Sequence, residues 1–362
     1  MFLDLSVEIR LILSIATSFL LAILLKYPIF NVAVKKENFE KENSRSSHNG
    51  IIPNIGGAII YVSFLASSLL YIKVTEANLQ YVLLSFTVLF FLGLYDDIIV
   101  ISHQNKFLGQ IIGVLVLILG NVYFTSFQGL FGLSLLPYYV AIPFTFIAVI
   151  GIINAMNLID GIDGLCSGMS ALIVFAFSFW FLKNGYYAFA ILGFIIIAAI
   201  IPFFVLNVFG KKYKMFLGDN GSLFLGMVLS VFIIKFCESN IGHNTWLHFS
   251  NAPAVAFTLM AIPVLDTIRV FITRFINKKS PYRPDRTHLH HLFLDLFNKN
   301  HKKATFCILS IQLFYLILVF FGHNLSGEIL IVISISSYLI LYLSVYTLKV
   351  RKEKTKKAIE TN

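Results

Sequence analysis

Residues 187–208, YAFAILGFIIIAAIIPFFVLNV, decide the class of this protein, because the stretch contains no charged side chain. A run of about 20 apolar residues is long enough for an α-helix to cross the hydrocarbon core of a bilayer. Similar runs recur along the whole chain, in which hydrophobic residues make up 58% and charged residues 13%. A soluble domain carries about 25% charged residues. The sequence therefore predicts an all-α, polytopic integral membrane protein.

The same length criterion predicts about eleven transmembrane helices in the whole chain. They are predicted near residues 8–29, 52–72, 79–95, 107–124, 136–153, 167–182, 187–208, 221–236, 253–275, 304–321 and 327–348. We expect one transmembrane domain over 1–348, followed by a basic tail over 349–362. An odd number of spans places the two ends of the chain on opposite sides of the membrane.

Basic residues predict the orientation of these spans. Of the 28 Lys and Arg residues, all but Arg10, Lys73, Lys183 and Lys235 lie in or beside alternate loops on one side. Because positive charge collects on the cytoplasmic side, the N-terminus is predicted outside and the C-terminus in the cytoplasm. The net charge of +10 therefore belongs mostly to one face, where it suits anionic headgroups and substrates. We expect no nucleic-acid partner, since no soluble basic domain is evident.

Short polar strings interrupt the apolar runs, and all of them fall on the predicted cytoplasmic side. They are YDDI at 95–98, NAMNLIDGIDGL at 154–165, LGDNGS at 217–222 and DRTHLHH at 285–291. Ionised side chains are costly in a bilayer, so their clustering at helix ends points to a function. We expect the strings to build one site for metal-dependent phosphate chemistry at the membrane surface.

The first string contains two neighbouring carboxylates, Asp96 and Asp97. Neighbouring carboxylates repel each other, so they need a cation, a proton or water between them. Mg²⁺ prefers oxygen ligands and usually keeps waters and substrate phosphates in its coordination shell. The alternative for this pair is a solvated helix terminus.

The second string repeats a polar residue at every third position: Asn154, Asn157, Asp160 and Asp163. On a helix, this spacing makes a slowly rotating polar stripe. Gly161 and Gly164 predict a break in the helix, where backbone amides can approach a ligand closely. Amides and carboxylates fit a nucleotide, a sugar hydroxyl or a metal. The alternative is a buried structural network, in which every polar group needs a partner.

The third string precedes a predicted span, so Asp219 and Ser222 are candidates for capping that helix. Capping alone does not explain the flanking glycines, or the basic residues Lys211, Lys212 and Lys214 just before the string. Such a loop can hold a metal through Asp219 and offer backbone amides to phosphate.

In the fourth string and the residues before it, arginines and histidines crowd together: Arg283, Arg286, His288, His290 and His291. Three histidines within four residues are compatible with a transition-metal site. The other strings offer oxygen ligands, however, and Arg beside His suits phosphate through bidentate hydrogen bonds. Solvated loop charge is the remaining alternative.

Together the strings resemble the signatures of the polyprenyl-phosphate N-acetylhexosamine-1-phosphate transferases, the WecA/TagO/MraY group of glycosyltransferase family 4. A first segment, HNGIIPNIGG at 48–57, is similar to the H-x-x-P-x-x-GG signature of that family. The aspartate pair is followed by Lys106, as in the family, and the second and third strings match two further signatures. His288-Leu289-His290-His291 resembles the H-x-H-H of the N-acetylglucosamine branch, which places the chain closest to the WecA/TagO side.

The resemblance implies a reaction. N-acetylglucosamine-1-phosphate passes from UDP-N-acetylglucosamine to undecaprenyl phosphate, which gives undecaprenyl-diphospho-N-acetylglucosamine and UMP. It also implies a bacterial inner membrane location, an active site facing the cytoplasm, a first step in a cell-envelope polysaccharide, and a homodimer. Another UDP-N-acetylhexosamine is an alternative donor. A lipid-phosphate transporter or flippase is an alternative class, although transporters place ionisable groups near the midplane of the membrane.

The resemblance further implies roles for individual residues. Mg²⁺, or alternatively Mn²⁺, is expected on Asp219, with Asp97 or Asp160 as further ligands. Asp96 is expected to position the lipid phosphate or to accept its proton. The expected catalytic residues are Asp96, Asp97, Asp160, Asp163 and His290. The expected substrate-binding residues are His48, Lys106, Asn154, Asn157, Arg283, Arg286, His288 and His291.

Overall fold

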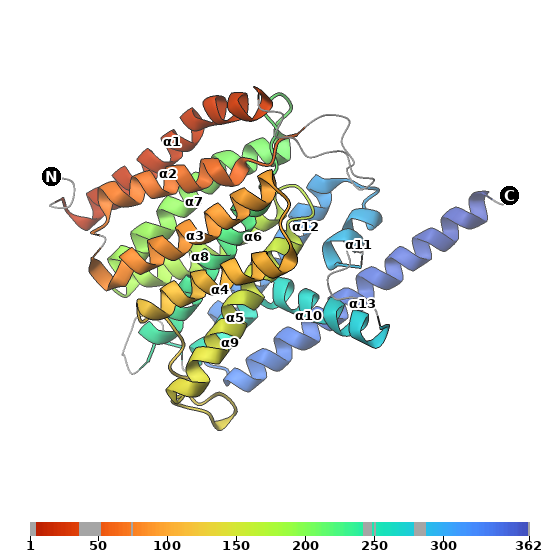
Figure 1. Ribbon diagram of the computed structural model, residues 1–362. Coiled ribbons are helices and arrows are strands. Elements are labelled where there is room, and N and C mark those ends of the chain that lie inside the picture. Colours follow the sequence, from red (N-terminus) through yellow and green to blue (C-terminus); the bar gives the residue numbers. More distant parts are fainter. Residues whose placement is uncertain are drawn as a thin grey trace.

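The computed structural model of the protein describes residues 5–35, 52–73, 75–241, 248–249, 251–278 and 287–360. Within these ranges the chain forms helices and two isolated backbone bridges, so the predicted all-α class is confirmed (Figure 1). The helices are α1 (Val7–Lys35), α2 (Gly56–Tyr71), α3 (Leu79–Ile98), α4 (His103–Leu119), α5 (Tyr138–Ile159), α6 (Leu165–Lys183), α7 (Tyr187–Phe209), α8 (Gly218–Ser239), α9 (Ala252–Leu259), α10 (Ala261–Ile276), α11 (Leu289–Leu296), α12 (His301–Phe321) and α13 (Gly327–Glu360), with short 3₁₀ helices at Glu76–Asn78 and Leu130–Gly132.

Eight of the described helices are long and apolar enough to cross a membrane: α1, α3, α5, α6, α7, α8, α12 and α13. The pair α9 and α10 is bent by 73° and would be a ninth if it forms one broken span. Helices α2 and α4 are apolar but contain only 16 and 17 residues, fewer than the roughly 20 that a bilayer core requires. The count of eleven spans and the orientation of the termini therefore stay predictions.

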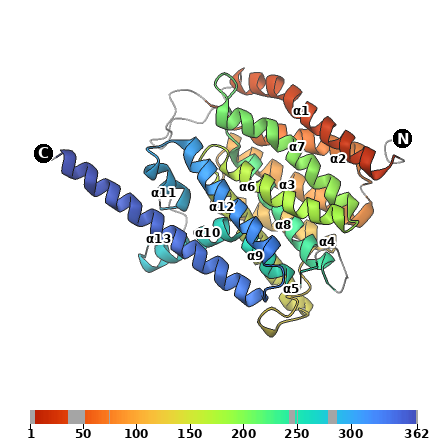
Figure 2. The ribbon, with the colours of Figure 1, turned by 180° about the vertical axis from the view of Figure 1, so that it is seen from behind.

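Helix α8 is the centre of the bundle. It packs against α2, α3, α5 and α6, and all its residues from 220 to 234 are buried. A helix that is apolar on all sides belongs inside a large protein or a membrane bundle. In Figure 1, α3, α4 and α5 lie in front of it, whereas α1 and α7 cover the opposite face in Figure 2.

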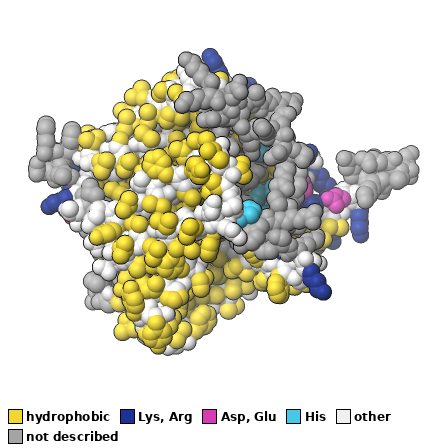
Figure 3. All heavy atoms as spheres, viewed as in Figure 1, with side chains coloured by type: hydrophobic (Ala, Val, Ile, Leu, Met, Phe, Trp, Pro, Cys, Tyr) yellow, Lys and Arg dark blue, Asp and Glu magenta, His cyan; other side chains and the backbone are white. Residues whose placement is uncertain are grey.

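Apolar side chains also cover the outside of the bundle, as Figure 3 shows over α2, α3, α4 and α5. Leu24, Phe91, Leu119, Ile147 and Ile340 are each more than half exposed. Monomeric soluble proteins rarely carry contiguous apolar patches larger than a few hundred Å². The outer surface therefore supports the predicted class of membrane protein.

Glycines let the backbones of α2 and α3 approach the first turn of α8. A Cβ atom added to Gly57 would overlap the backbone of Gly221, and one added to Gly93 would overlap the backbone of Asp219. Small residues at helix interfaces permit such close packing in membrane proteins. These contacts hold the end of α3, which carries the aspartate pair, against the start of α8.

A short backbone pairing joins the segments that precede α2 and α8. The amide of Phe216 donates to the carbonyl of Pro53 at 3.0 Å, and the amide of Gly56 donates to the carbonyl of Phe216 at 2.9 Å. Gly57 donates in the same way to Leu217 at 3.0 Å. The described part of the predicted 48–57 signature is thereby fixed beside the 217–222 string.

The residues predicted as a basic tail begin as a continuation of α13. Lys352 Nζ donates to the carbonyl oxygens of Asp295 and Leu296, at 3.1 and 2.7 Å, and Lys349 Nζ lies 2.8 Å from Asp295 Oδ2. A lysine at this position satisfies the last carbonyl groups of a helix, here those of α11. The C-terminal part of α13 thus holds α11 in place.

The packing of Gly93 can be tested against that of Gly151, a second glycine inside a helix, around which an added Cβ atom would meet nothing within 4 Å. Gly93→Ala should destabilise the protein by about 1–3 kcal/mol, because the extra methyl group overpacks the contact between α3 and α8. Gly151→Ala should leave stability unchanged or slightly raised, since Ala is the better helix former. Thermal unfolding of both purified variants in detergent would measure this. Equal midpoints would contradict the close approach of α3 and α8.

Candidate active site

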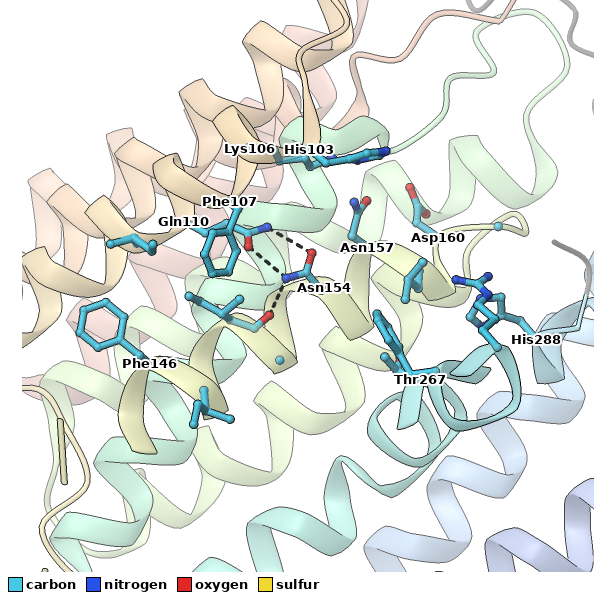
Figure 4. A pocket seen from close by; sticks show the side chains of 18 of the residues that line it. His103, Lys106, Phe107, Gln110, Phe146, Asn154, Asn157, Asp160, Thr267 and His288 are labelled. Atoms are coloured by element: carbon cyan, nitrogen blue, oxygen red, sulfur yellow. Dashed lines mark hydrogen bonds between the residues drawn. The ribbon is translucent and has the colours of Figure 1, made fainter. Parts of the chain in front are cut away.

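Several helix ends meet around a cavity of about 860 Å³ (Figure 4). Residues of α4, α5, α10 and the start of α11 line it. Its polar lining includes His103, Lys106, Gln110, Asn154, Asn157, Asp160, Arg274, His288, His290 and His291. Segments that lie far apart in the sequence thus converge on one volume.

The cavity brings together many of the predicted site residues: Lys106, Asn154, Asn157, Asp160, His288, His290 and His291. Asp96 and Asp219 contact Lys106 from behind the lining, whereas Asp97 and Asp163 are engaged elsewhere. The predicted residues His48, Arg283 and Arg286 lie outside the described residues.

Lys106, in the first turn of α4, joins two of the predicted acids. Its Nζ lies 2.8 Å from Asp96 Oδ2 and 2.7 Å from Asp219 Oδ2. The Asn157 amide is satisfied when its nitrogen donates to Asp219 Oδ1 at 2.8 Å and its oxygen accepts from Lys106 Nζ at 3.1 Å. Two carboxylates therefore share one ammonium group, which leaves an excess of negative charge that favours a further cation.

Asp97 binds the N-terminus of α8. Its Oδ1 accepts from the amide of Asp219 at 2.9 Å, and its Oδ2 accepts from the amide and the side chain of Asn220 at 2.9 and 2.6 Å. The first amides of a helix lack partners within the helix, and the positive end of its dipole attracts a carboxylate. Both oxygens of Asp97 are thus engaged, and this geometry favours a positioning role over the metal-ligand role that the sequence suggested.

Gly218 permits this contact. It has a φ of 76°, and a Cβ atom there would lie 2.8 Å from Asp97 Oδ2 and 3.0 Å from the carbonyl oxygen of Asn54. Glycine alone adopts positive φ without a steric penalty. Gly218 therefore allows Asp97 to approach the start of α8 closely.

Asp96 lies where α3 turns into α4. Its Oδ1 accepts from the amide of Ile101 at 2.9 Å, while its Oδ2 faces Lys106. The two neighbouring acids of the first string thus point to different partners: Asp97 to the start of α8, and Asp96 to the turn and the ammonium group of Lys106.

The second string follows the predicted pattern of a helix that breaks partway. Helix α5 ends at Ile159, and Gly164 has a φ of 76° just before α6 begins. The amide side chain of Asn154 forms a reciprocal pair with that of Gln110, at 3.0 and 3.3 Å. These residues lie on the cavity side, as Figure 4 shows for Asn154, Asn157 and Asp160.

Asp163 follows the break and lies in a buried ion pair. Its Oδ2 is 2.6 Å from Lys214 Nζ and 3.5 Å from His301 Nδ1, while its carbonyl oxygen accepts from Thr305 Oγ1 at 2.6 Å. Asp163 is absent from the cavity lining. The contacts join the break after α5 to α12 and to the loop before α8.

Sequence reasoning missed several residues of this site, namely His103, Asp266, Arg269 and Arg274. Arg274 is buried and lines the cavity at the last turn of α10. Asp266 is the single acid between residues 252 and 276 and is 2% exposed. An ionisable residue inside an apolar span is a functional candidate by default, and this signal would have found Asp266.

The donor set bears on which metal the site can hold. No group of three or more His, Cys, Asp or Glu side chains gathers as a metal cage among the residues that the structure describes. The acids Asp96 and Asp219 instead share the ammonium group of Lys106, which lines a cavity with room for a substrate. Mg²⁺ commonly takes one or two carboxylates and completes its shell with waters and substrate phosphates. The residues present therefore fit a hard cation that is bound together with its substrate.

Comparison with known proteins agrees with this geometry. The sequence model of glycosyl transferase family 4 matches residues 79–237. An Escherichia coli (strain K12) protein named undecaprenyl-phosphate alpha-N-acetylglucosaminyl 1-phosphate transferase is 32% identical over 272 residues, which cover 73% of this chain and 71% of that protein. A Bacillus subtilis protein named "Probable undecaprenyl-phosphate N-acetylglucosaminyl 1-phosphate transferase" is 28% identical over 306 residues, covering 83% and 81%. The chain belongs to glycosyl transferase family 4, and the resemblance found in its motifs is confirmed.

The different roles of Asp96 and Asp97 can be tested by measuring how much a substitution of each lowers the stability of the protein. Asp97→Asn should destabilise the protein by about 2 kcal/mol or more, because an amide cannot accept on both sides from the start of α8. Asp96→Asn should cost less, since its remaining oxygen still accepts from Ile101 and Lys106 keeps Asp219. Thermal unfolding in detergent compares the two variants directly. A larger loss for Asp96→Asn would refute the assignment of Asp97 as the anchor of α8.

Proposed function

We propose that this protein transfers N-acetylglucosamine-1-phosphate from UDP-N-acetylglucosamine to undecaprenyl phosphate, producing undecaprenyl-diphospho-N-acetylglucosamine and UMP. The observation that carries the proposal is a cavity with one charged end and one apolar end. The names of the relatives in Escherichia coli and Bacillus subtilis support the same transferred sugar phosphate and the same lipid acceptor.

The apolar end of the cavity suits a polyprenyl chain. Phe107, Ile111, Phe146, Ile147 and Ile150 line it from α4 and α5. Ile147 is 73% exposed, so this lining reaches the outer surface of the bundle. In Figure 4, Phe146 lies at the far end from Asp160 and His288. A lipid phosphate can therefore place its chain along the apolar end and its headgroup among the charged residues.

The charged end suits the donor. Lys106, Arg274 and the histidines of the 285–291 string surround it with cationic or hydrogen-bonding groups, and such groups bind phosphate oxygens strongly. Asn154 and Asn157 offer amides to the nucleotide or the sugar. Positive groups placed where charge develops lower the barrier to phosphoryl transfer.

For the metal, we propose Asp219 as the main ligand of Mg²⁺ or Mn²⁺, with Asp160 as a further ligand. When bound, the cation would supply charge neutralisation at the diphosphate and orient it. Asp97 would hold the first turn of α8, and with it Asp219, in place. Lys106 would share its charge between Asp96, Asp219 and the incoming phosphates.

In the proposed reaction, an oxygen of the lipid phosphate attacks the β-phosphorus of the sugar nucleotide in line, and the bond to the departing UMP breaks. A phosphate monoester has a second pKa near 6 and is mostly dianionic at neutral pH, so this oxygen needs no general base. Asp96 would orient Lys106 and the lipid phosphate. Direct attack is favoured over a covalent enzyme intermediate, because the oxygens of Asp96 and Asp97 are all engaged with protein groups.

The membrane setting belongs to the same proposal. The site would face the cytoplasm of a bacterial cell at the inner membrane, where UDP-sugars are made, and a homodimer is the expected assembly. The product would begin a cell-envelope polysaccharide.

The reaction can be tested with purified protein in detergent, undecaprenyl phosphate, Mg²⁺ and UDP-N-acetylglucosamine labelled in the sugar. We expect label in the organic phase, UMP as the released nucleotide, and loss of both on chelation. UDP in place of UMP would refute sugar-phosphate transfer. Turnover only with another UDP-N-acetylhexosamine would refute the donor, and no turnover with any of them would favour a lipid-phosphate transporter.

The metal proposal is tested by Asp219→Ala. Turnover should fall about 1,000-fold, equivalent to about 4 kcal/mol, and binding of Mn²⁺, followed by electron paramagnetic resonance, should weaken. Glu353→Gln is the control, because Glu353 is an exposed acid near the end of α13. Unchanged Mn²⁺ binding in Asp219→Ala would remove Asp219 from the metal site.

A further inference from the structure

A buried cluster of polar side chains lies beside the histidine end of the cavity. Asp266 of α10 is its centre and is only 2% exposed. Its partners come from three elements: Arg269 from α10, His288 and Leu289 from the start of α11, and Tyr338 from α13. A buried carboxylate is costly unless it is well paired, so this cluster requires an explanation.

The two oxygens of Asp266 have different partners. Oδ1 accepts from Arg269 Nη2 at 2.7 Å, from Tyr338 Oη at 3.0 Å and from the amide of Leu289 at 3.0 Å. Oδ2 lies 2.8 Å from His288 Nδ1. Three donors thus contact Oδ1, whereas Oδ2 has a ring nitrogen of His288 as its one partner among the residues that the structure describes.

This arrangement determines which nitrogen of His288 carries a proton. Arg269 beside Asp266 favours the ionised carboxylate, which can only accept hydrogen bonds. Nδ1 of His288 must therefore be the donor in the contact with Oδ2. The other ring nitrogen, Nε2, has no hydrogen-bond partner among the described residues, and His288 lines the cavity. Figure 4 places His288 at the end of the cavity near Asp160.

We propose that Asp266 is a positioning residue for His288. It holds Nδ1 protonated and the ring in one orientation, so that Nε2 faces the phosphates of the sugar nucleotide. This inference rests on the proposed function and extends it to the role of one histidine. A carboxylate behind an imidazole sets tautomer and orientation in the same way in other enzymes.

Further contacts of Arg269 hold Asp266 and His288 in place. Arg269 also donates from Nη2 to the carbonyl of Thr287 at 2.7 Å and from Nε to Tyr338 Oη at 3.2 Å, and its guanidinium group stacks on the ring of Tyr342 at 4.3 Å. Arg269 therefore ties the residue before His288 to α13. The C-terminal helix, remote in sequence from the other motifs, takes part in placing a side chain of the cavity.

Asp266→Asn is the informative substitution, because it preserves the shape of the side chain. The amide oxygen can keep the donors at the Oδ1 position, while the amide nitrogen then faces His288 Nδ1 and donates to it. The proton of the ring should move to Nε2. We expect turnover to fall about 10- to 100-fold, by analogy with carboxylates that orient metal-ligating histidines, with little change in the thermal midpoint.

A double-mutant cycle with His288→Asn separates positioning from general stability. If Asp266 acts through His288, Asp266→Asn should cost turnover in the native background and nothing further in the His288→Asn background. Glu353→Gln is the control, since Glu353 is an exposed acid near the end of α13. It should leave turnover within about 2-fold of native protein. Equal losses from Asp266→Asn in both backgrounds would overturn the proposal.

A spectroscopic readout makes the test independent of the reaction. In protein labelled with ¹⁵N-histidine, the signals of His288 are those that disappear in His288→Asn. Native protein should show a protonated Nδ1, and Asp266→Asn should show an unprotonated Nδ1. An unprotonated Nδ1 in the native protein would overturn the proposal. If native protein fails to transfer sugar phosphate, the proposed function falls, while this spectrum still decides whether Asp266 sets the tautomer.

Discussion

The hydrogen bonds between Asp97 and the first amides of α8 form the contact on which the rest of the site depends. Helix α8 is enclosed by α2, α3, α5 and α6, so its position is set by packing over its length. Its first turn lies at the cavity end, where packing alone leaves unpaired amides. Asp97 satisfies them at 2.9 Å and thereby locates Asp219. The glycines at 57, 93 and 218 are consequences of the same contact, since each keeps the backbones of α2, α3 and α8 close together.

The acidic side chains around the cavity lie in three separate groups, and each group has its own cationic or hydrogen-bonding partners. Lys106 lies between Asp96 and Asp219 in a set that still carries excess negative charge, which suits a cation arriving with an anionic substrate. Asp163 and Lys214 neutralise each other in a buried pair that joins loops. Asp266 contacts Arg269, Tyr338 and His288 beside the histidine end of the cavity. Acids that look alike in sequence therefore have different partners, according to the groups that surround them.

Much of the architecture followed from apolar periodicity and length, because a bilayer admits few backbone arrangements. Apolar length did not predict the helix bounds or the bend in three segments, around 52–72, 107–124 and 253–275. The first two form helices of 16 and 17 residues, and the third bends by 73° between α9 and α10. Hydropathy measures the composition of a window, whereas a helix end or a bend depends on what the backbone packs against. The break after α5 was predictable because Gly161 and Gly164 signal it directly.

By itself, the sequence determined the membrane class, the helical fold and the family, since these follow from composition and from motifs that are local in the chain. It also identified many of the polar residues that line the cavity. The partner of each side chain is visible only in the tertiary structure: Asp97 accepts from the first amides of α8, Asp163 pairs with Lys214, and Asp266 contacts His288. The reason is physical. The role of a carboxylate depends on donors within about 3 Å, and here those donors come from helices that are remote in sequence.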